Sequence, residues 1–155
     1  PAIAQGIAAN WLERTAALSG RTLASLQVWD VLQTLAWALA GDPGLPATIY
    51  GQGEAGVVGL YAALFAPAVG QVVLRDPPSS HRSGPALLTV LRTADTPEVA
   101  ATLAPRMLTW LSDPAPAYDF TRHVYRLCGA EDRFRKASAL AAAVSRAWEA
   151  EEERL

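Results

Sequence analysis

Three glycines stand at a spacing that suits chemistry on a phosphate group. They lie in the segment Tyr50-Gly51-Gln52-Gly53-Glu54-Ala55-Gly56-Val57, between a short apolar run and an apolar segment with helical character. A strand-to-helix turn of this kind points backbone N–H groups into a crevice at the positive end of the helix dipole. Gly51, Gly53 and Gly56 match the G-x-G-x-x-G pattern of dinucleotide-binding loops. On this interpretation Asp76, twenty residues beyond Gly56, binds the ribose hydroxyls.

Two features oppose the dinucleotide interpretation. Glu54 places a carboxylate in the loop that would receive a pyrophosphate, and two predicted helices precede a turn that normally opens its domain. Another interpretation of the turn needs no ligand, because glycines also permit a tight turn with close helix–strand packing. Beyond the dinucleotide interpretation the residues indicate no cofactor. One cysteine and two histidines make no convincing zinc site.

The elements that position this turn follow from the apolar pattern, which predicts one α/β domain over residues 1–155. Helices are expected at residues 3–18, 23–39, 55–65, 85–91, 96–103, 118–127 and 133–152, and strands at 47–50, 71–74 and 106–111. Thr96 is the expected N-cap of the 96–103 helix. Strands that alternate with helices predict a parallel sheet with helices on both faces. Three strands are few for such a sheet, so further strands or a larger protein are expected.

Composition excludes several classes of function. The net charge of −2 gives no electrostatic footprint for nucleic acid. No apolar run is long enough to suggest a membrane span. Cys128 is expected to be a small buried hydrophobe, and Arg106 to bond neighbouring carbonyls or Asp95. The tryptophans are expected to be core or interface anchors, and Trp29, out of phase with the apolar stripe of its helix, to face a partner.

Further segments follow the glycine-rich turn in a characteristic order. They are Tyr61-Ala62-Ala63-Leu64, Val72-Val73-Leu74, Pro77-Pro78-Ser79-Ser80, Asp95-Thr96-Pro97-Glu98 and Ala104-Pro105-Arg106. Their arrangement resembles the C-terminal half of α/β-hydrolase-fold esterases, in particular the acetyl xylan esterase and dienelactone-hydrolase-like group. The resemblance runs from about residue 21 to about residue 135. It implies a partial α/β-hydrolase-like sheet.

The resemblance also implies where a catalytic triad would lie. Gly51 matches the first glycine of the G-x-S-x-G nucleophile elbow, which places Gly53 on the serine. Asp113 best matches the triad acid, with Asp119 next. No histidine follows at the position of the base, because His123 falls inside a predicted helix. Hydrolysis by the usual Ser-His-Asp route is therefore not expected.

Three functions remain open at this point. The first is a degenerate, non-catalytic hydrolase-like module with a structural or binding role, whose partner is another protein chain or an N-terminal segment. The second is an active carboxylesterase or acetyl esterase with an atypical nucleophile near Gly53, such as Ser80 or Glu54, beside Asp113. The third is a dinucleotide-binding domain that uses Gly51, Gly53 and Gly56.

Overall fold

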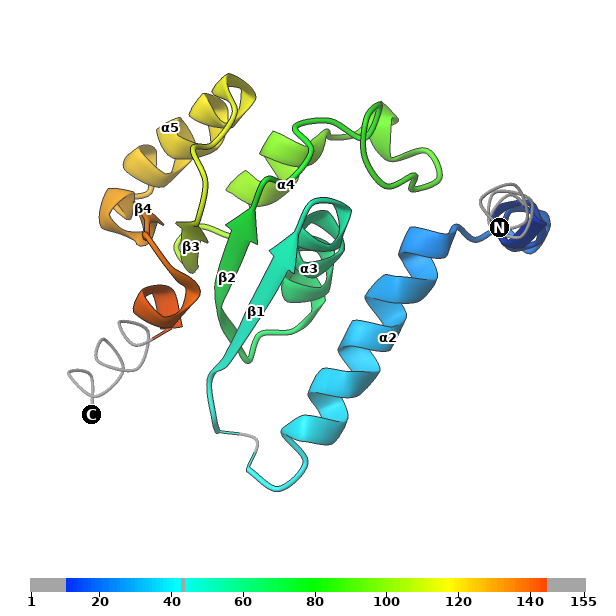
Figure 1. Cartoon of the computed structure of the whole chain (residues 1–155), viewed down its shortest axis with the longest axis horizontal. Coiled ribbons are helices and arrows are strands. Elements are labelled where there is room, and N and C mark those ends of the chain that lie inside the picture. The colour runs from blue at the N-terminus through cyan, green and yellow to red at the C-terminus, as the bar shows by residue number, and fades with distance from the viewer. Residues whose placement is uncertain (1–10, 43, 145–155) are drawn as a thin grey trace.

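The computed structural model describes residues 11–42 and 44–144, and shows a parallel four-stranded sheet flanked by helices (Figure 1). The strands are β1 (Ala47–Gln52), β2 (Val69–Arg75), β3 (Met107–Trp110) and β4 (Phe134–Lys136). They lie side by side in chain order, β1-β2-β3-β4, and every pair is parallel. The predicted fold class is therefore confirmed, with one strand more than the sequence pattern indicated.

Helices precede and connect the strands, and two of them begin at side-chain caps. They are α2 (Leu23–Ala38), α3 (Glu54–Phe65), α4 (Thr96–Ala101) and α5 (Asp119–Leu127), with short 3₁₀ turns at Val90–Arg92, Pro116–Tyr118 and Glu131–Arg133. Residues 11–18 and 140–144 are also helical. Thr22 and Ser25 form a reciprocal capping box at the start of α2. At α4 the cap is Asp95, not Thr96 as predicted, because the Asp95 and Glu98 side chains bond the free N–H groups of the first turn.

Helices α3, α4 and α5 cover one face of the sheet. Their buried side chains form a single cluster with residues of β2 and β3, among them Leu60, Val72, Val99, Trp110 and Tyr125. The opposite face carries the alternating residues, represented by Gln71, which is 2% exposed. The Gln71 amide donates to Thr109 Oγ1 at 2.9 Å and to the Ala143 carbonyl at 3.1 Å. The last described helical turn therefore lies on this second face.

Helix α2 packs on α3 beside β1. Ala24 and Val28 of α2 meet Val58 and Ala62 of α3 in a second buried cluster. In Figure 1 α2 lies on the side of β1 that faces away from β2. Strand β1 is thus one edge of the described sheet, and α2 lies beyond that edge.

Three further sequence-based expectations are wrong. The closing helix predicted at 133–152 begins later, because Phe134–Lys136 pair with β3 as strand β4; residues 145–152 of this prediction lie outside the described residues. The helix predicted at 85–91 is only the 3₁₀ turn Val90–Arg92. Cys128 is exposed, since it is the C-cap residue of α5 rather than part of its packed face.

Among the described residues, no helix combines the length and the apolar character that a membrane crossing requires.

Candidate functional site

The glycine-rich turn connects β1 to α3 at the carboxyl edge of the sheet. Gly53 is the N-cap of α3 and has φ 56° and ψ −132°, a backbone conformation that favours glycine. A Cβ built at Gly53 would meet no atom within 4 Å. The turn therefore presents an open position where a side chain would project. Only a hydrogen atom occupies it.

Gly51 and Gly56 bring the strand and the helix into close approach. A Cβ at Gly51 would lie 2.4 Å from Gly56 Cα and 2.7 Å from the Ala55 carbonyl oxygen. A Cβ at Gly56 would lie 3.1 Å from Leu74 Cδ2. Packing alone thus accounts for these two glycines. Glu54 follows as an exposed residue in the first turn of α3, where its charge complements the helix dipole.

The carboxyl ends of the next two strands lie beside this turn. The Gly53 N–H donates to the Arg75 carbonyl at 2.8 Å, directly before Asp76. Asp76 has φ 47°, the left-handed region that is uncommon outside glycine. Its N–H donates to Ser112 Oγ at 2.9 Å, so the loop after β3 fixes the end of β2. Gly53, Asp76 and Ser112 therefore share one edge of the sheet.

Asp113 lies at the same edge and forms an ion pair with Lys136. The Lys136 ammonium at the end of β4 donates to Asp113 Oδ1. Both side chains are largely exposed, at 56% for Lys136 and 87% for Asp113. Asp113, the predicted triad acid, is thus paired with the amine of Lys136, the last residue of β4. A triad histidine would be expected directly after that strand. The next residues, Ala137 and Ser138, carry no imidazole.

Ser80 lies in the long connection after β2 and binds Asp95. The Ser80 hydroxyl donates to Asp95 Oδ2 at 2.6 Å, and Ser80 Oγ accepts from the Arg82 N–H at 3.1 Å. The His81 and Thr96 N–H groups donate to Asp95 Oδ1. Burial raises the pKa of Asp95, but the hydrogen bonds from Ser80, His81 and Thr96 outweigh it and hold the pKa below its usual range. The hydroxyl of Ser80 therefore ties the connection to the cap of α4.

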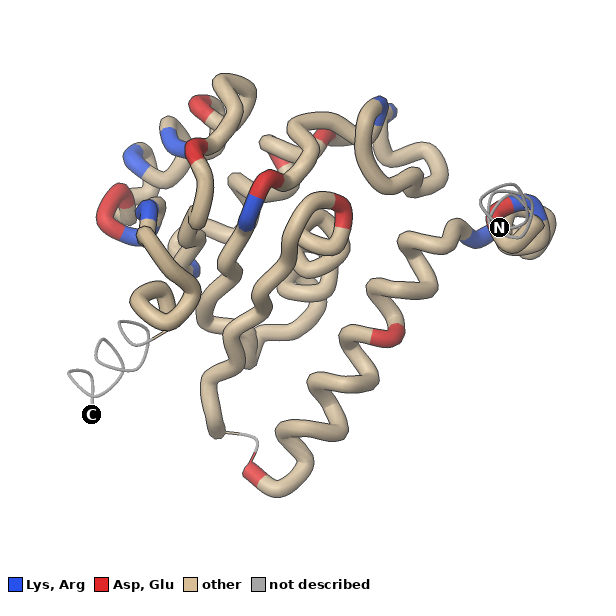
Figure 2. Tube along the Cα trace, viewed as in Figure 1, with Lys and Arg blue, Asp and Glu red and all other residues tan. Residues whose placement is uncertain are grey.

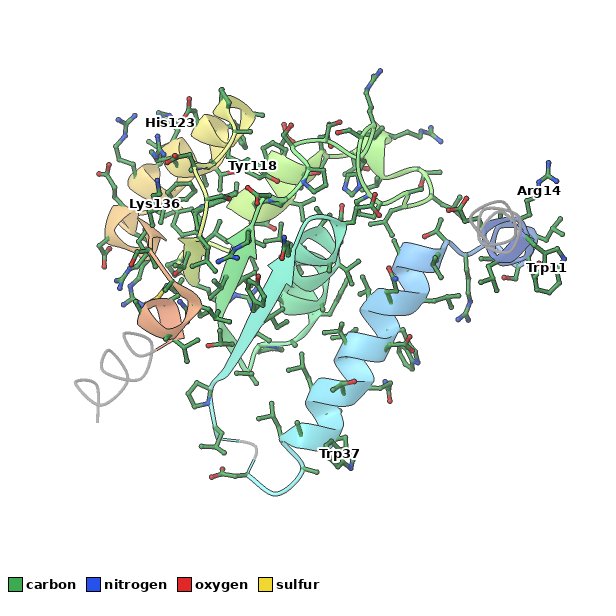
Figure 3. The ribbon with its side chains drawn as sticks, in the orientation of Figure 1. Trp11, Arg14, Trp37, Tyr118, His123 and Lys136 are labelled. Atoms are coloured by element: carbon green, nitrogen blue, oxygen red, sulfur yellow. The ribbon has the colours of Figure 1, made fainter. Side chains whose placement is uncertain are left out.

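The two histidines serve other contacts. His81 is buried, and its Nδ1 lies 2.8 Å from the Pro85 carbonyl oxygen, which can only accept. In the neutral ring Nε2 then accepts from the Tyr61 hydroxyl at 2.9 Å. Burial, followed by the charge of Asp95, raises the pKa of Tyr61 to about 12. His123 lies on α5 as predicted, where its Nδ1 accepts from Arg126 at 2.6 Å (Figure 3).

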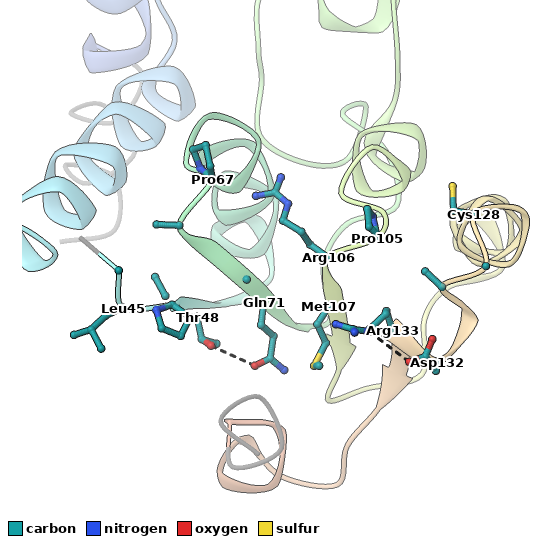
Figure 4. Close-up of a pocket in the computed structure, with 17 residues that line it drawn as sticks. Leu45, Thr48, Pro67, Gln71, Pro105, Arg106, Met107, Cys128, Asp132 and Arg133 are labelled. Atoms are coloured by element: carbon teal, nitrogen blue, oxygen red, sulfur yellow. Dashed lines mark hydrogen bonds and ion pairs between the residues drawn. The ribbon is translucent and has the colours of Figure 1, made fainter. Parts of the chain in front are cut away.

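A cavity of about 560 Å³ lies at the other edge of the sheet, where the strands begin (Figure 4). Its lining includes Gln71, Cys128 and Arg133, and Arg133 Nε lies 3.4 Å from Asp132 Oδ2. Arg106, also in the lining, is held by the carbonyls of Ala63, Ala66 and Val69, at 2.6, 3.3 and 3.2 Å. This confirms the carbonyl contacts expected of Arg106. The cavity is large enough for a small ligand, but no candidate residue from the sequence lines it.

The carboxyl edge is therefore the better candidate site, because ligands of parallel α/β sheets bind where the strands end. The structure brings together Gly53, Glu54, Asp76 and Asp113 at that edge, while Ser80 is held by Asp95. Among the described residues, no group of three or more His, Cys, Asp or Glu side chains could hold a metal ion. Sequence reasoning missed Lys136, since β4 was not recognised. The sequence does single this residue out, because Lys136 is the only lysine of the chain.

Comparison with known proteins adds no relative to this description. No family model, curated protein or solved structure matches the chain.

Proposed function

We propose that the chain is a degenerate, non-catalytic α/β-hydrolase-like module with a structural or binding role in a larger protein or complex. The observation that carries the proposal is Gly53. It stands at the strand-to-helix turn with φ 56° and ψ −132° and with open space beside its Cα, but without a nucleophile. The backbone conformation of this turn and the lack of a side chain at residue 53 support a hydrolase-like elbow without a nucleophile.

The remaining polar groups support the same proposal. Asp113 is paired with the Lys136 ammonium, which donates hydrogen bonds and accepts none. His81 is buried between the Pro85 carbonyl and Tyr61. Among the described residues, no histidine is therefore free to act as the base beside Gly53, and the usual triad needs both a nucleophile and that base.

The dinucleotide alternative is less well supported. Such ligands lie at the point where the strand order of the sheet reverses. The described sheet runs β1-β2-β3-β4 without a reversal. Asp76 directly follows β2, where the fingerprint expects an acidic residue. Thermal stabilisation by NAD that is lost in Asp76→Ala would therefore be evidence for this function.

Hydrolysis of 4-nitrophenyl acetate tests the proposal. We expect the natively purified protein to match the uncatalysed rate, and Gly53→Ser to match it as well because no described histidine is free to activate the new hydroxyl. Ser80→Ala and Glu54→Gln serve as matched variants. Ester cleavage by the natural protein that either variant abolishes would replace the proposal with an active esterase that uses an atypical nucleophile.

A further inference from the structure

Strand β1 leaves one row of backbone hydrogen-bonding groups directed away from the sheet. The Ala47 N–H donates to the Ala68 carbonyl and the Gly53 N–H to the Arg75 carbonyl. A parallel ladder uses alternate residues, so the odd-numbered residues of β1 bond β2. The N–H and C=O groups of Thr48, Tyr50 and Gln52 therefore point outward. Among the described residues, no turn, loop or side-chain hydrogen bond reaches these backbone groups.

Strand β1 itself carries none of the usual sequence features that protect an edge against strand addition. Natural sheets cover or shorten their edges, or place lysine and proline there. Strand β1 has six residues, none of them lysine or proline, whereas β4 at the other edge has three, including Lys136. An exposed row of alternating donors and acceptors is matched in spacing by one kind of partner, an extended polypeptide strand.

The surface around the free edge is almost without charge. From residue 22 to residue 74 the chain has no Lys, Arg or His, and its acidic residues are Asp30, Asp42 and Glu54. Figure 2 shows the charged residues gathered around α5 and β4, with few on α2, α3 and β1. The same region exposes large apolar side chains: Trp37 at 80%, Phe65 at 67%, Trp29 at 58% and Tyr50 at 40%. Trp37 projects outward from the end of α2 (Figure 3).

A second copy of the chain is a poor occupant of the edge. Helix α2 lies beyond β1 on the side away from β2 (Figure 1). Two copies that met edge to edge with antiparallel strands would bring both α2 helices to the same face of the shared edge, where they would compete for space. A strand without a helix beyond its own edge has no such conflict. It would pass alongside α2, whose Val31 and Leu35 are partly buried apolar residues that pack against the two buried core clusters.

We infer that the free edge of β1 binds an extended strand of a different polypeptide chain, through the backbone groups of Thr48, Tyr50 and Gln52. The strand is uncharged where it passes α2 and adds to the sheet as its fifth strand. The inference rests on the proposed function and names the surface and the kind of partner. It has its own readout, because strand addition is measured by hydrogen exchange and the proposed lack of catalysis by ester cleavage.

Residue-resolved hydrogen exchange, with intact-mass analysis of every chain present, tests the inference. The natively purified assembly is compared with the same chain produced alone. We expect the amides of Thr48, Tyr50 and Gln52 to exchange at least about tenfold more slowly in the assembly, because each gains or flanks a strand hydrogen bond. The amides of Ile49 and Gly51 bond β2 in both samples and serve as internal controls.

Two variants separate backbone recognition from side-chain recognition. Tyr50→Pro removes an outward N–H without removing a bond to β2, and proline is tolerated at such edge positions. Tyr50→Ala removes the ring and keeps the N–H. We expect Tyr50→Pro to lose the partner and Tyr50→Ala to keep it, with both variants folded by circular dichroism.

Four results would overturn the inference. The natural protein could have the mass of one chain with unprotected edge amides, or the mass of two identical chains. Another part of the same polypeptide could protect the edge. Lastly, a folded Tyr50→Pro variant could leave the assembly unchanged. The exchange comparison needs no substitution, so a variant that fails to fold leaves the test intact.

Discussion

We expect the protein to tolerate a serine at residue 53 at a moderate cost in stability. An alanine at residue 51 is expected to cost more, because it would force β1 and α3 apart. At Gly53 the obstacle is conformational, because φ 56° and ψ −132° disfavour any side chain. A non-glycine residue in such a region costs about 1–3 kcal/mol. Because a Cβ there meets no atom within 4 Å, no steric cost is added.

At Gly51 the obstacle is steric. A Cβ would lie 2.4 Å from Gly56 Cα, whereas two carbon atoms normally approach to about 3.5 Å. Strand β1 and helix α3 would have to separate by about 1 Å, since both contacting groups are backbone. Overpacking typically costs 1–3 kcal/mol, occasionally more. We expect Gly51→Ala to fall at about 3 kcal/mol or above.

Urea unfolding of both variants against the unchanged protein measures the two costs. In a domain of this size each kcal/mol lowers the melting temperature by about 2–4 °C. Gly53→Ala is the matched control for Gly53→Ser, and the two should agree because the Cβ that they share meets no atom within 4 Å. The reasoning is refuted if Gly53→Ser costs more than Gly51→Ala, or if Gly53→Ser leaves the free energy of unfolding unchanged.

Three further substitutions test contacts away from the turn. Asp95→Asn should flatten the pH dependence of stability. The pKa of Asp95 is lowered in the folded state, so the ionised carboxylate stabilises the fold above about pH 4, and this contribution is lost as the pH falls through the folded-state pKa. Parallel acid-unfolding curves for the natural protein and the variant would contradict this. Arg106→Met should lower the free energy of unfolding by about 1.5–3 kcal/mol, because three carbonyls lose a charged donor, and urea titration beside the exposed control Arg122→Met, which should change it by less than about 1 kcal/mol, checks this. Tyr61→Phe should lower the free energy of unfolding by about 1 kcal/mol, because His81 Nε2 loses its donor; an unchanged urea midpoint would mean that this hydrogen bond contributes nothing.

Local patterns in the sequence determined much of the fold. The turn at Gly51–Gly56, helix α2 and strands β1 to β3 were predictable because their glycines, caps and apolar periods act within one element. Strand β4 was not predictable, since three residues hold too little pattern and their conformation depends on pairing with Leu108, Thr109 and Trp110. The aromatic contacts of Phe134 with Trp110 and Tyr125 exist only once the sheet has formed.

Some features of the candidate site were likewise predictable from the sequence, and others were not. The absence of a side chain at Gly53 is visible in the sequence, and the position of Asp113 after β3 follows from the strand order. The pairing of Asp113 with Lys136 joins residues 23 positions apart across two strands, and no local signal predicts it. The bond between Ser80 and Asp95 likewise depends on how the long connection folds back on α4.

The strand order also bears on how the domain is built during synthesis. Each strand pairs with the one that precedes it in the chain, as in Ile49 with Val72, Val72 with Leu108 and Leu108 with Phe134. The paired residues are 23, 36 and 26 positions apart, so no pairing waits for a distant segment. As the polypeptide leaves the ribosome, the sheet can grow one strand at a time, from β1 towards β4. The outer side of β1 is then available from the first pairing onward, long before the helix after β4 has been translated.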